Sequence, residues 1–407
     1  MADKTMIALL RRALREAFLR RSRTGHGDHA AKFPSFASVV AALALLPIQA
    51  HGQEAATPAP PSSSEAVEPV PEGDGPRPKL VIAPIPQSDP TLGTGVTVVA
   101  MSLYRVGGSQ QAWTTGGGAM YTDSRSWGAL LLQRAYFRHD TIRVTAIAGY
   151  GDFNIDFYGV GADAAARGQS VGLNQKGYGA IVQGLVEVQP NLFVGPRLQY
   201  VDLTSRLTTP PIPGLGIDPA DLTLNAVSVS LGLGSEYDTR DSEYGPRTGT
   251  LASGQWLVAS PDLGSDFSYS KFQASINGYH PAGDKGVLAG RVFVCGASDD
   301  APFFDLCLFG SHNDLRGYAS GQYRDSAMVA AQMEFRRRLF WRIGYVAFAG
   351  VGSVAPGFSD LGDARLLPAA GVGLRFEASA EYRLNFSIDA AVGDHSAGVY
   401  VYLGEAF

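Results

Sequence analysis

Apolar and polar residues alternate along most of the chain from residue 79 to the C-terminus. Between residues 384 and 392 every second position is apolar, and Asn385, Ser387 and Asp389 lie between those positions. The same period of two occurs at 223–237, 267–279 and 326–339. Because successive side chains of a β-strand point to opposite faces, this pattern predicts strands with one apolar and one polar face.

Two architectures accommodate such strands. A soluble β-sandwich buries the apolar faces, whereas an outer-membrane barrel turns them toward lipid and keeps the polar faces in its lumen. The runs here are about 10–14 residues long, which suits the 9–11 residues of a membrane-crossing strand and exceeds most strands of soluble proteins. Short connections such as 280–286 also alternate with long ones such as 298–325. The sequence therefore predicts an all-β fold, a transmembrane antiparallel β-barrel over residues 79–407.

Fifteen candidate strands can be counted, from 95–104 to 396–407. Bacterial single-chain barrels have an even number of strands, so about sixteen are expected. The segments 79–86 and 154–161 are the candidates for the remaining strand. Both ends of the barrel chain are expected in the periplasm, and the part after residue 230 is the best defined.

The N-terminus has the composition of a targeting segment. Arginines precede the apolar run "ASVVAALALLP" at 37–47, and the segment "IQAHGQ" follows it. This order is typical of a secretory signal peptide, so residues 1–52 are interpreted as one; a buried amphipathic helix is the alternative. Residues 53–78 are rich in Pro, Ser, Glu and Ala without periodicity, which predicts a disordered tether.

Composition argues against several functions. The net charge is −5 and no basic stripe exists, so no nucleic-acid partner is expected. No Ser/His/Asp group falls on one strand face, so no catalytic residue, enzymatic activity, cofactor or metal site is expected. The two cysteines, Cys295 and Cys307, are too few for a zinc site or a disulfide scaffold. In an oxidising compartment they form either one disulfide or two free thiols.

The long connection 298–325 contains the sequence Leu315-Arg316-Gly317-Tyr318. Three other segments accompany it: "YDTRDSEYGPRTGT" at 237–250, "MEFRRRL" at 333–339 and "VAFAGVGSV" at 346–354. With these motifs in this order, the chain resembles the BamA/TamA superfamily of outer-membrane assembly barrels (bacterial surface antigen domain). The resemblance implies that the long extracellular loop folds back into the barrel, with an Arg-Gly-aromatic tip.

The residues of this loop suggest a latch. Glu334 shares a strand face with Arg336, which points both into the lumen, and an infolded Arg316 can form a charge-assisted pair with Glu334. Gly317 permits a turn with positive φ, and Tyr318 is expected to pack near Phe348. In the family a second carboxylate follows two residues after that phenylalanine, where this chain has Gly350, so the latch is expected to rest mainly on Glu334. A solvated extracellular Arg316 is the alternative.

The C-terminal residues Val401, Leu403 and Phe407 share one face, which resembles the assembly signal of outer-membrane barrels. The resemblance implies an integral outer-membrane protein of a Gram-negative bacterium that assists the insertion or translocation of proteins; a passive pore for small solutes is the alternative. The expected partners are outer-membrane lipid and unfolded outer-membrane or secreted proteins. The chain resembles the subgroup without N-terminal periplasmic domains, so a separate periplasmic partner is also expected.

Overall fold

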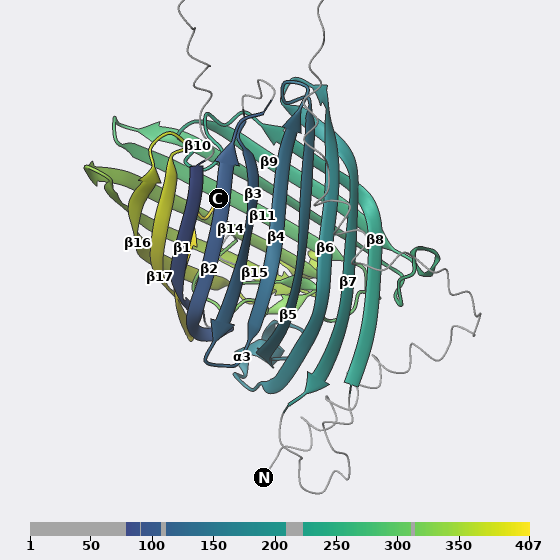
Figure 1. The fold of residues 1–407 in the computed structure, drawn as a ribbon. Helices are drawn as coiled ribbons and strands as arrows, with labels where there is room; N and C mark the ends of the chain where they lie inside the picture. The colour runs from purple at the N-terminus through teal and green to yellow at the C-terminus, as the bar shows by residue number, and fades with distance from the viewer. Residues whose placement is uncertain (1–78, 90, 107–110, 209–222, 311–313) are drawn as a thin grey trace, which may run out of the picture. The chain divides into compact units, whose positions relative to one another are not determined.

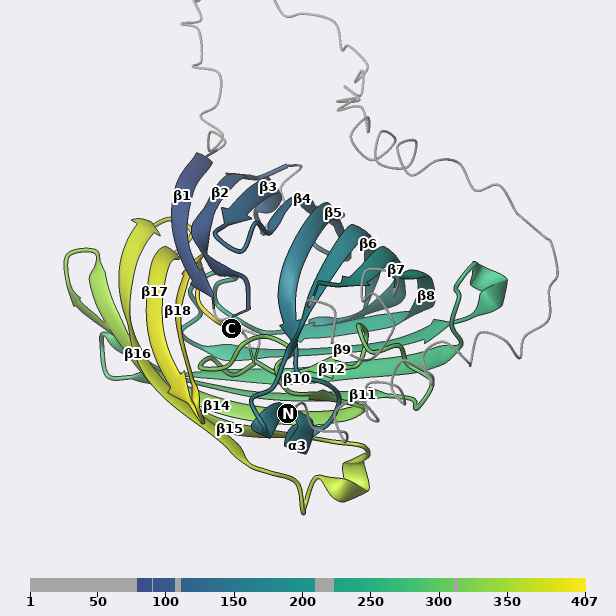
Figure 2. The same cartoon turned by 90° about the horizontal axis from the view of Figure 1, so that it is seen from below.

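The computed structural model describes residues 79–89, 91–106, 111–208, 223–310 and 314–407. The predicted signal peptide and tether, 1–78, lie outside these residues. Sixteen antiparallel strands form one closed barrel (Figures 1 and 2), and each pairs with its neighbours in sequence order. The predicted fold class is therefore confirmed. The N-terminal strands are β1 (Lys79–Asp89), β2 (Gly93–Tyr104), β3 (Trp113–Thr122), β4 (Trp127–Phe137), β5 (Ile142–Phe157), β6 (Val171–Gln189), β7 (Leu192–Leu207) and β8 (Thr223–Asp238).

The second half of the barrel encloses the long loop. Its strands are β9 (Gly249–Ala259), β10 (Tyr269–Ala282), β11 (Gly286–Ala297), β14 (Ala327–Phe340), β15 (Ile343–Ala355), β16 (Leu367–Ser379), β17 (Leu384–Gly393) and β18 (Ser396–Leu403). Between β11 and β14, the short strands β12 (Cys307–Leu308) and β13 (Arg324–Asp325) pair with each other as a separate two-stranded sheet. The helical turns are α3 (Ala162–Ala166), η3 (Pro261–Leu263) and η4 (Phe358–Asp360). No helix among the described residues is long and apolar enough to span a bilayer.

The strand that the alternation left unidentified is β1. The segment 79–86 belongs to it, whereas 154–161 contains only the end of β5 and the residues that follow. Pro84 and Pro86 remove two backbone donors from β1. Proline within sheets is largely confined to edge strands, and β1 occupies the position where the first and last strands of the barrel meet.

The outer face of the barrel is apolar on both halves. Leu233, Trp256, Ile276 and Val372 are 52–62% exposed and point away from the lumen. The lumen face differs between the halves: β14, β16 and β17 carry buried charged residues, as the polar-lumen prediction requires. On β2–β6 the lumen face is largely apolar as well, so there the prediction of a polar interior is wrong.

The first and last strands form a weak seam. Among the described residues β1 and β18 pair at one position, Ser88 with Val399. By contrast, β17 and β18 pair continuously from Phe386 with Leu403 to Gly393 with Ser396. Backbone hydrogen bonds of the ladder are what close a membrane barrel, so this seam is the least constrained joint of the wall.

The chain turns into the lumen after β18, because Gly404 adopts a φ of 95°. Phe407 then packs against Tyr279, Val287 and Ala289, which face the barrel interior. The expectation that Phe407 shares one face with Val401 and Leu403 is therefore wrong. A positive φ is accessible to glycine at little cost, and the inward turn takes the last three residues out of the strand period.

Candidate functional site

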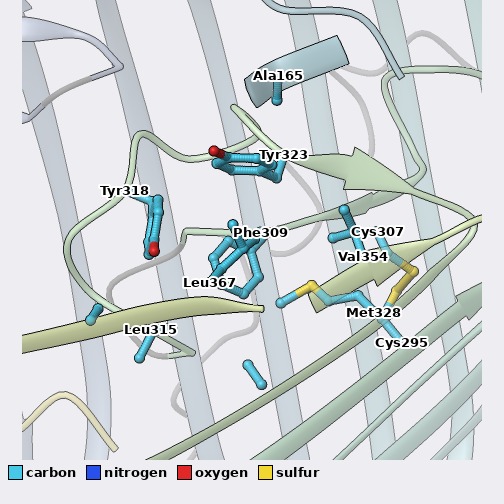
Figure 3. Packing of buried hydrophobic residues seen from close by; sticks show 12 residues of the cluster. Ala165, Cys295, Cys307, Phe309, Leu315, Tyr318, Tyr323, Met328, Val354 and Leu367 are labelled. Carbon is cyan, nitrogen blue, oxygen red and sulfur yellow. A yellow bond between two sulfur atoms is a disulfide. The ribbon is translucent and has the colours of Figure 1, made fainter. Parts of the chain in front are cut away.

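The loop between β11 and β14 folds into the barrel and is built around a buried aromatic cluster (Figure 3). The ring centroid of Tyr318 lies 5.2 Å from that of Phe309 and 5.7 Å from that of Tyr323, both in edge-to-face geometry. Edge-to-face aromatic pairs add to the free energy that burial itself contributes. Cys295 of β11 and Cys307 of β12 form a disulfide with a Cα–Cα distance of 5.8 Å, which ties the start of the loop to the barrel wall.

Arg316, at the tip of this loop, is fully buried in the lumen. Its guanidinium donates hydrogen bonds to the carboxylates of Glu334 on β14 and Asp389 on β17. It also donates to Gln332 Oε1 at 3.2 Å, and its Cζ lies 3.5 Å from the ring centroid of Phe348. A planar guanidinium with five donors suits a site that presents two carboxylates and an aromatic face at once.

The second carboxylate partner of Arg316 corrects the sequence interpretation. The expectation that the latch rests mainly on Glu334 is wrong, because Asp389 supplies another acceptor from a different strand. Gly350 has another role: a Cβ built there would lie 2.6 Å from Leu315 Cδ1 and 2.4 Å from the carbonyl oxygen of Ala331. An aspartate at 350 would therefore displace the buried Leu315.

The arginine lies within a network of six charged side chains. Glu334 also accepts from Arg336 at 2.8 Å, and Asp389 accepts from Arg375 at 2.5 Å. Glu405, in the inward-turned C-terminal tail, lies 2.8 Å from Arg375 and 3.5 Å from Arg336. Three arginines thus face three carboxylates, and Arg316 alone comes from the loop. Without the loop tip, the wall site would hold one excess negative charge in a buried environment, which is unfavourable.

Gly317 and Tyr318, the two residues that follow the arginine, anchor the tip to the barrel wall. Gly317 has a φ of 117°, and a Cβ there would lie 2.9 Å from the carbonyl carbon of Val392. Its N–H donates to the hydroxyl of Tyr400 on β18 at 2.9 Å. The Tyr318 hydroxyl donates to the carbonyl of Pro368 at 2.6 Å. The expected packing of Tyr318 near Phe348 is wrong, because Arg316 covers that ring while Tyr318 packs within the loop's own aromatic cluster.

A second set of contacts crosses the lumen at the end of the barrel where the β8–β9 turn lies. In the β8–β9 turn, residues 239–248, Glu243 pairs with Arg134 of β4, and the hydroxyls of Tyr244 and Thr114 of β3 lie 2.6 Å apart. Asp241 accepts from Arg383, in the β16–β17 turn, at 2.5 Å. The turn therefore crosses from one wall of the barrel to the other.

Tyr244 also belongs to a cluster that joins the two sides of the seam from within. It packs with Leu103 and Val81 of β2 and β1 and with Leu384 and Leu403 of β17 and β18. At this end of the barrel the seam is therefore held by side-chain packing where backbone pairing is sparse.

Comparison with known proteins places this geometry in a family. The model of the Omp85 superfamily domain matches residues 113–407. The chain belongs to the Omp85 superfamily. The barrel of this Omp85 protein is similar in structure to BamA from Haemophilus ducreyi lacking POTRA domains 1–3, at a TM-score of 0.54 and 17% sequence identity over 80% of this chain and 69% of that one.

Two further structures share the fold. CdiB from Acinetobacter baumannii matches at a TM-score of 0.51 and 11% identity over 79% of this chain and 58% of its own. CdiB from Escherichia coli matches at 0.52 and 13% identity, over 79% of this chain and 61% of its own. The Omp85 chain thus spans about three-fifths of the CdiB chains. Among curated proteins, the sequence has no match.

The structure brings together all the residues that sequence reasoning assigned to the loop and its lumen partners: Leu315, Arg316, Gly317, Tyr318, Glu334, Arg336 and Phe348. It adds Asp389, Tyr400 and Tyr402 as further partners of the loop, and Glu405 as a partner of the wall arginines Arg336 and Arg375. The acidity of Glu405 within an apolar C-terminal segment is the one sign of an inward role that the sequence offers. Among the described residues, no three His, Cys, Asp or Glu side chains are arranged to hold a metal ion.

Proposed function

We propose that this Omp85 barrel is integral to the outer membrane of a Gram-negative bacterium and assists the insertion or translocation of proteins there. The supporting observation is the seam, where β1 and β18 pair at Ser88 and Val399 alone among the described residues. A barrel whose wall can part at one joint can pass a segment sideways between lumen and lipid without unfolding its other ladders. The buried Arg316 loop keeps the lumen occupied while the seam is closed.

The proposed client is an unfolded outer-membrane or secreted protein, and a separate periplasmic protein is the proposed source of that client. The barrel fold that the chain shares with BamA and CdiB is compatible with this proposal. The function is non-enzymatic in this proposal, since seam opening requires no covalent step.

A seam-locking experiment tests the proposal. Opposed residues of an antiparallel ladder have Cα atoms about 4.5–5.5 Å apart, which is within the range of a disulfide. The variant Ser88→Cys/Val399→Cys, once oxidised, should lock the seam. Folding of a denatured second outer-membrane barrel is then followed in liposomes containing the wild type, the locked variant or either single-cysteine variant.

We expect the wild type and both single variants to accelerate client folding over empty liposomes, and the locked variant to lose the acceleration. Equal acceleration by the locked variant would refute seam opening. If the wild type gives no acceleration but conducts ions steadily across the same membranes, the pore alternative replaces the proposal.

A further inference from the structure

The lumen face of β2–β6 carries an apolar surface that the charged loop site does not use. Arg134 of β4 pairs with Glu243 and Arg143 of β5 pairs with Glu236 of β8, so both arginines point into the lumen. Residues two and four positions further along these strands share that face. The apolar wall is defined here as Val99, Met101, Leu130, Leu132, Ile147 and Ile181, which ladder pairing sets in adjacent rows.

Glycines make this wall smooth and leave space in front of it. Gly118, Gly149 and Gly179 continue the row of Val99 and Leu130 across β3, β5 and β6. A Cβ built at Gly179 would meet no atom within 4 Å, so the lumen is open there. Leu130 is 49% exposed although it faces inward. Removing apolar surface from water contributes about 25 cal/mol per Å² of free energy. The exposed apolar wall therefore favours the binding of an apolar ligand.

One arginine beside the wall has no carboxylate partner among the residues that the structure describes. Arg197 of β7 lies on the lumen face at the periplasmic edge of the apolar wall and donates to Gln183 Oε1 at 2.7 Å. Among the described residues, its buried Nε has no hydrogen-bond partner and Arg197 forms no ion pair. Arg134 and Arg143, by contrast, are each paired with a carboxylate. An incompletely paired guanidinium next to apolar surface is complementary to an anionic amphiphile.

We propose that the lumen binds one anionic membrane lipid, with its phosphate or carboxylate head at Arg197 and an acyl chain along the apolar wall. From Arg197 to Leu203, β7 rises about 20 Å at roughly 3.3 Å per residue. That length accommodates the acyl layer of one leaflet, about 15 Å or half of a 30 Å hydrocarbon core. The site is separate from the seam mechanism and holds whether or not the barrel inserts proteins.

An unfolded protein segment suits this surface less well than a lipid. The strands that form the wall pair with both of their neighbours, so their backbone groups are already engaged. An extended peptide on the wall would leave its own N–H and C=O groups without partners, which costs free energy in an apolar environment. An acyl chain carries no such groups.

The test uses the full-length protein in amphipol and a fluorescent fatty acid, 11-(dansylamino)undecanoic acid, whose emission rises in apolar surroundings. Three variants probe the site: Arg197→Gln removes the cation, Gln183→Glu pairs it with a carboxylate, and Gly179→Leu fills the open space without a clash. Arg338→Gln, at a 59% exposed arginine side chain on β14, is the matched charge control. Resistance to SDS without heating verifies that each variant is folded.

Loss of the charge-assisted contact should weaken binding about tenfold in Arg197→Gln and Gln183→Glu, equivalent to 1.4 kcal/mol. Gly179→Leu should also weaken it, and Arg338→Gln should bind as the wild type does. A neutral amide analogue of the probe should bind more weakly to the wild type and be insensitive to Arg197→Gln. Equal binding of the fatty acid by all variants would show partition into the amphipol belt alone and overturn the proposal. If an apolar peptide displaces the probe from the wild type, and Arg197→Gln does not change that displacement, the wall binds protein segments instead of lipid.

Discussion

Arg316→Ala is expected to release the loop tip from the lumen while leaving the barrel folded. Arg316, Glu334 and Asp389 are fully buried, and the substitution leaves these two carboxylates to share Arg336 and Arg375 with Glu405. Removing one partner of a buried ion pair costs about 3–5 kcal/mol. If that cost falls on the inserted state, the ratio of inserted to released loop drops by roughly 10²- to 4 × 10³-fold.

Hydrogen exchange and limited proteolysis of residues 315–325 measure this equilibrium, and thermal unfolding of the barrel is followed separately. Arg338→Gln is the matched control, because Arg338 of β14 pairs with Glu377 through a side chain that is 59% exposed, where ion pairs contribute about 0–1 kcal/mol. Wild-type protection of the loop in Arg316→Ala would refute the latch.

A charge-balance variant separates the ion pairs from packing. Arg316→Gln/Glu334→Gln leaves Arg336 and Arg375 facing Asp389 and Glu405, so the buried charges are again equal in number. The hydrogen-exchange protection of the loop should therefore fall less in the double variant than the sum of the losses in the two single variants, as expected for residues in one network. Additive losses would show that the loop is held by packing alone.

Three shorter predictions concern the ends of the lumen. Replacing Cys295 and Cys307 by serine should destabilise the loop base by about 3 kcal/mol, the value for a loop of this length, measured by proteolysis of the loop. Tyr244→Ala should weaken the packing across the seam by about 2 kcal/mol, roughly half the cost for a fully buried aromatic residue, measured as faster cysteine labelling at position 88 in Ser88→Cys. Acidification should release the β8–β9 turn: burial alone would raise the pKa of Asp241, but the backbone N–H of Arg247 and the Arg383 side chain together lower it. An Asp side chain in the unfolded chain has a pKa near 4, so the ionised Asp241 stabilises the fold above about pH 4. Because its pKa is lowered in the folded state, this stabilisation is lost as the pH falls through the folded-state pKa. The stability difference between wild type and Asp241→Asn should therefore vanish below the folded-state pKa.

Each of these has a result that would contradict it. Unchanged proteolysis after loss of the disulfide would place the rigidity of the loop in its aromatic cluster. Equal labelling at position 88 with and without Tyr244 would mean that the cluster does not hold the seam. A constant difference between wild type and Asp241→Asn from pH 6 to pH 3 would show that ionisation of Asp241 is irrelevant to the turn.

The wall of the barrel was predictable from the sequence because strand periodicity is local. Residues 384–392 show their two faces without any knowledge of their neighbours. The strand that the sequence predicted least clearly was β1, because Pro84 and Pro86 lie within it. The apolar lumen of β2–β6 was also missed, because alternation identifies strands only when the two faces differ.

The site was partly predictable for a different reason. Glu334 lies close to Arg316 in sequence and on a strand with clear alternation, so the pair could be proposed from the motif. Asp389 is 73 residues away from Arg316, and its contact with the arginine depends on how β17 curves around the lumen. The ion pairs of Glu405 with Arg336 and Arg375 depend on the turn at Gly404, and hydrophobic periodicity does not predict that turn.

The loop and the seam are in direct contact, which makes Tyr400 a decisive residue. The Tyr400 hydroxyl accepts from Gly317 N–H at 2.9 Å and donates to the Tyr318 carbonyl at 3.2 Å, so the seam strand β18 holds the two residues that follow the arginine. Tyr400→Phe removes both bonds and leaves a buried N–H without its partner, at a cost of about 1–3 kcal/mol.

If loop insertion and seam closure are coupled, the loss in Tyr400→Phe must appear twice, as more exchange in the loop and as faster labelling of Ser88→Cys at the seam. Tyr136→Phe is the matched control, since that hydroxyl donates to Glu243 at 3.3 Å, away from the loop. More exchange in the loop with unchanged labelling at the seam would mean that the two move independently. In that case β18 serves only as a surface on which the loop rests, and release of the loop would not be needed for the seam to open.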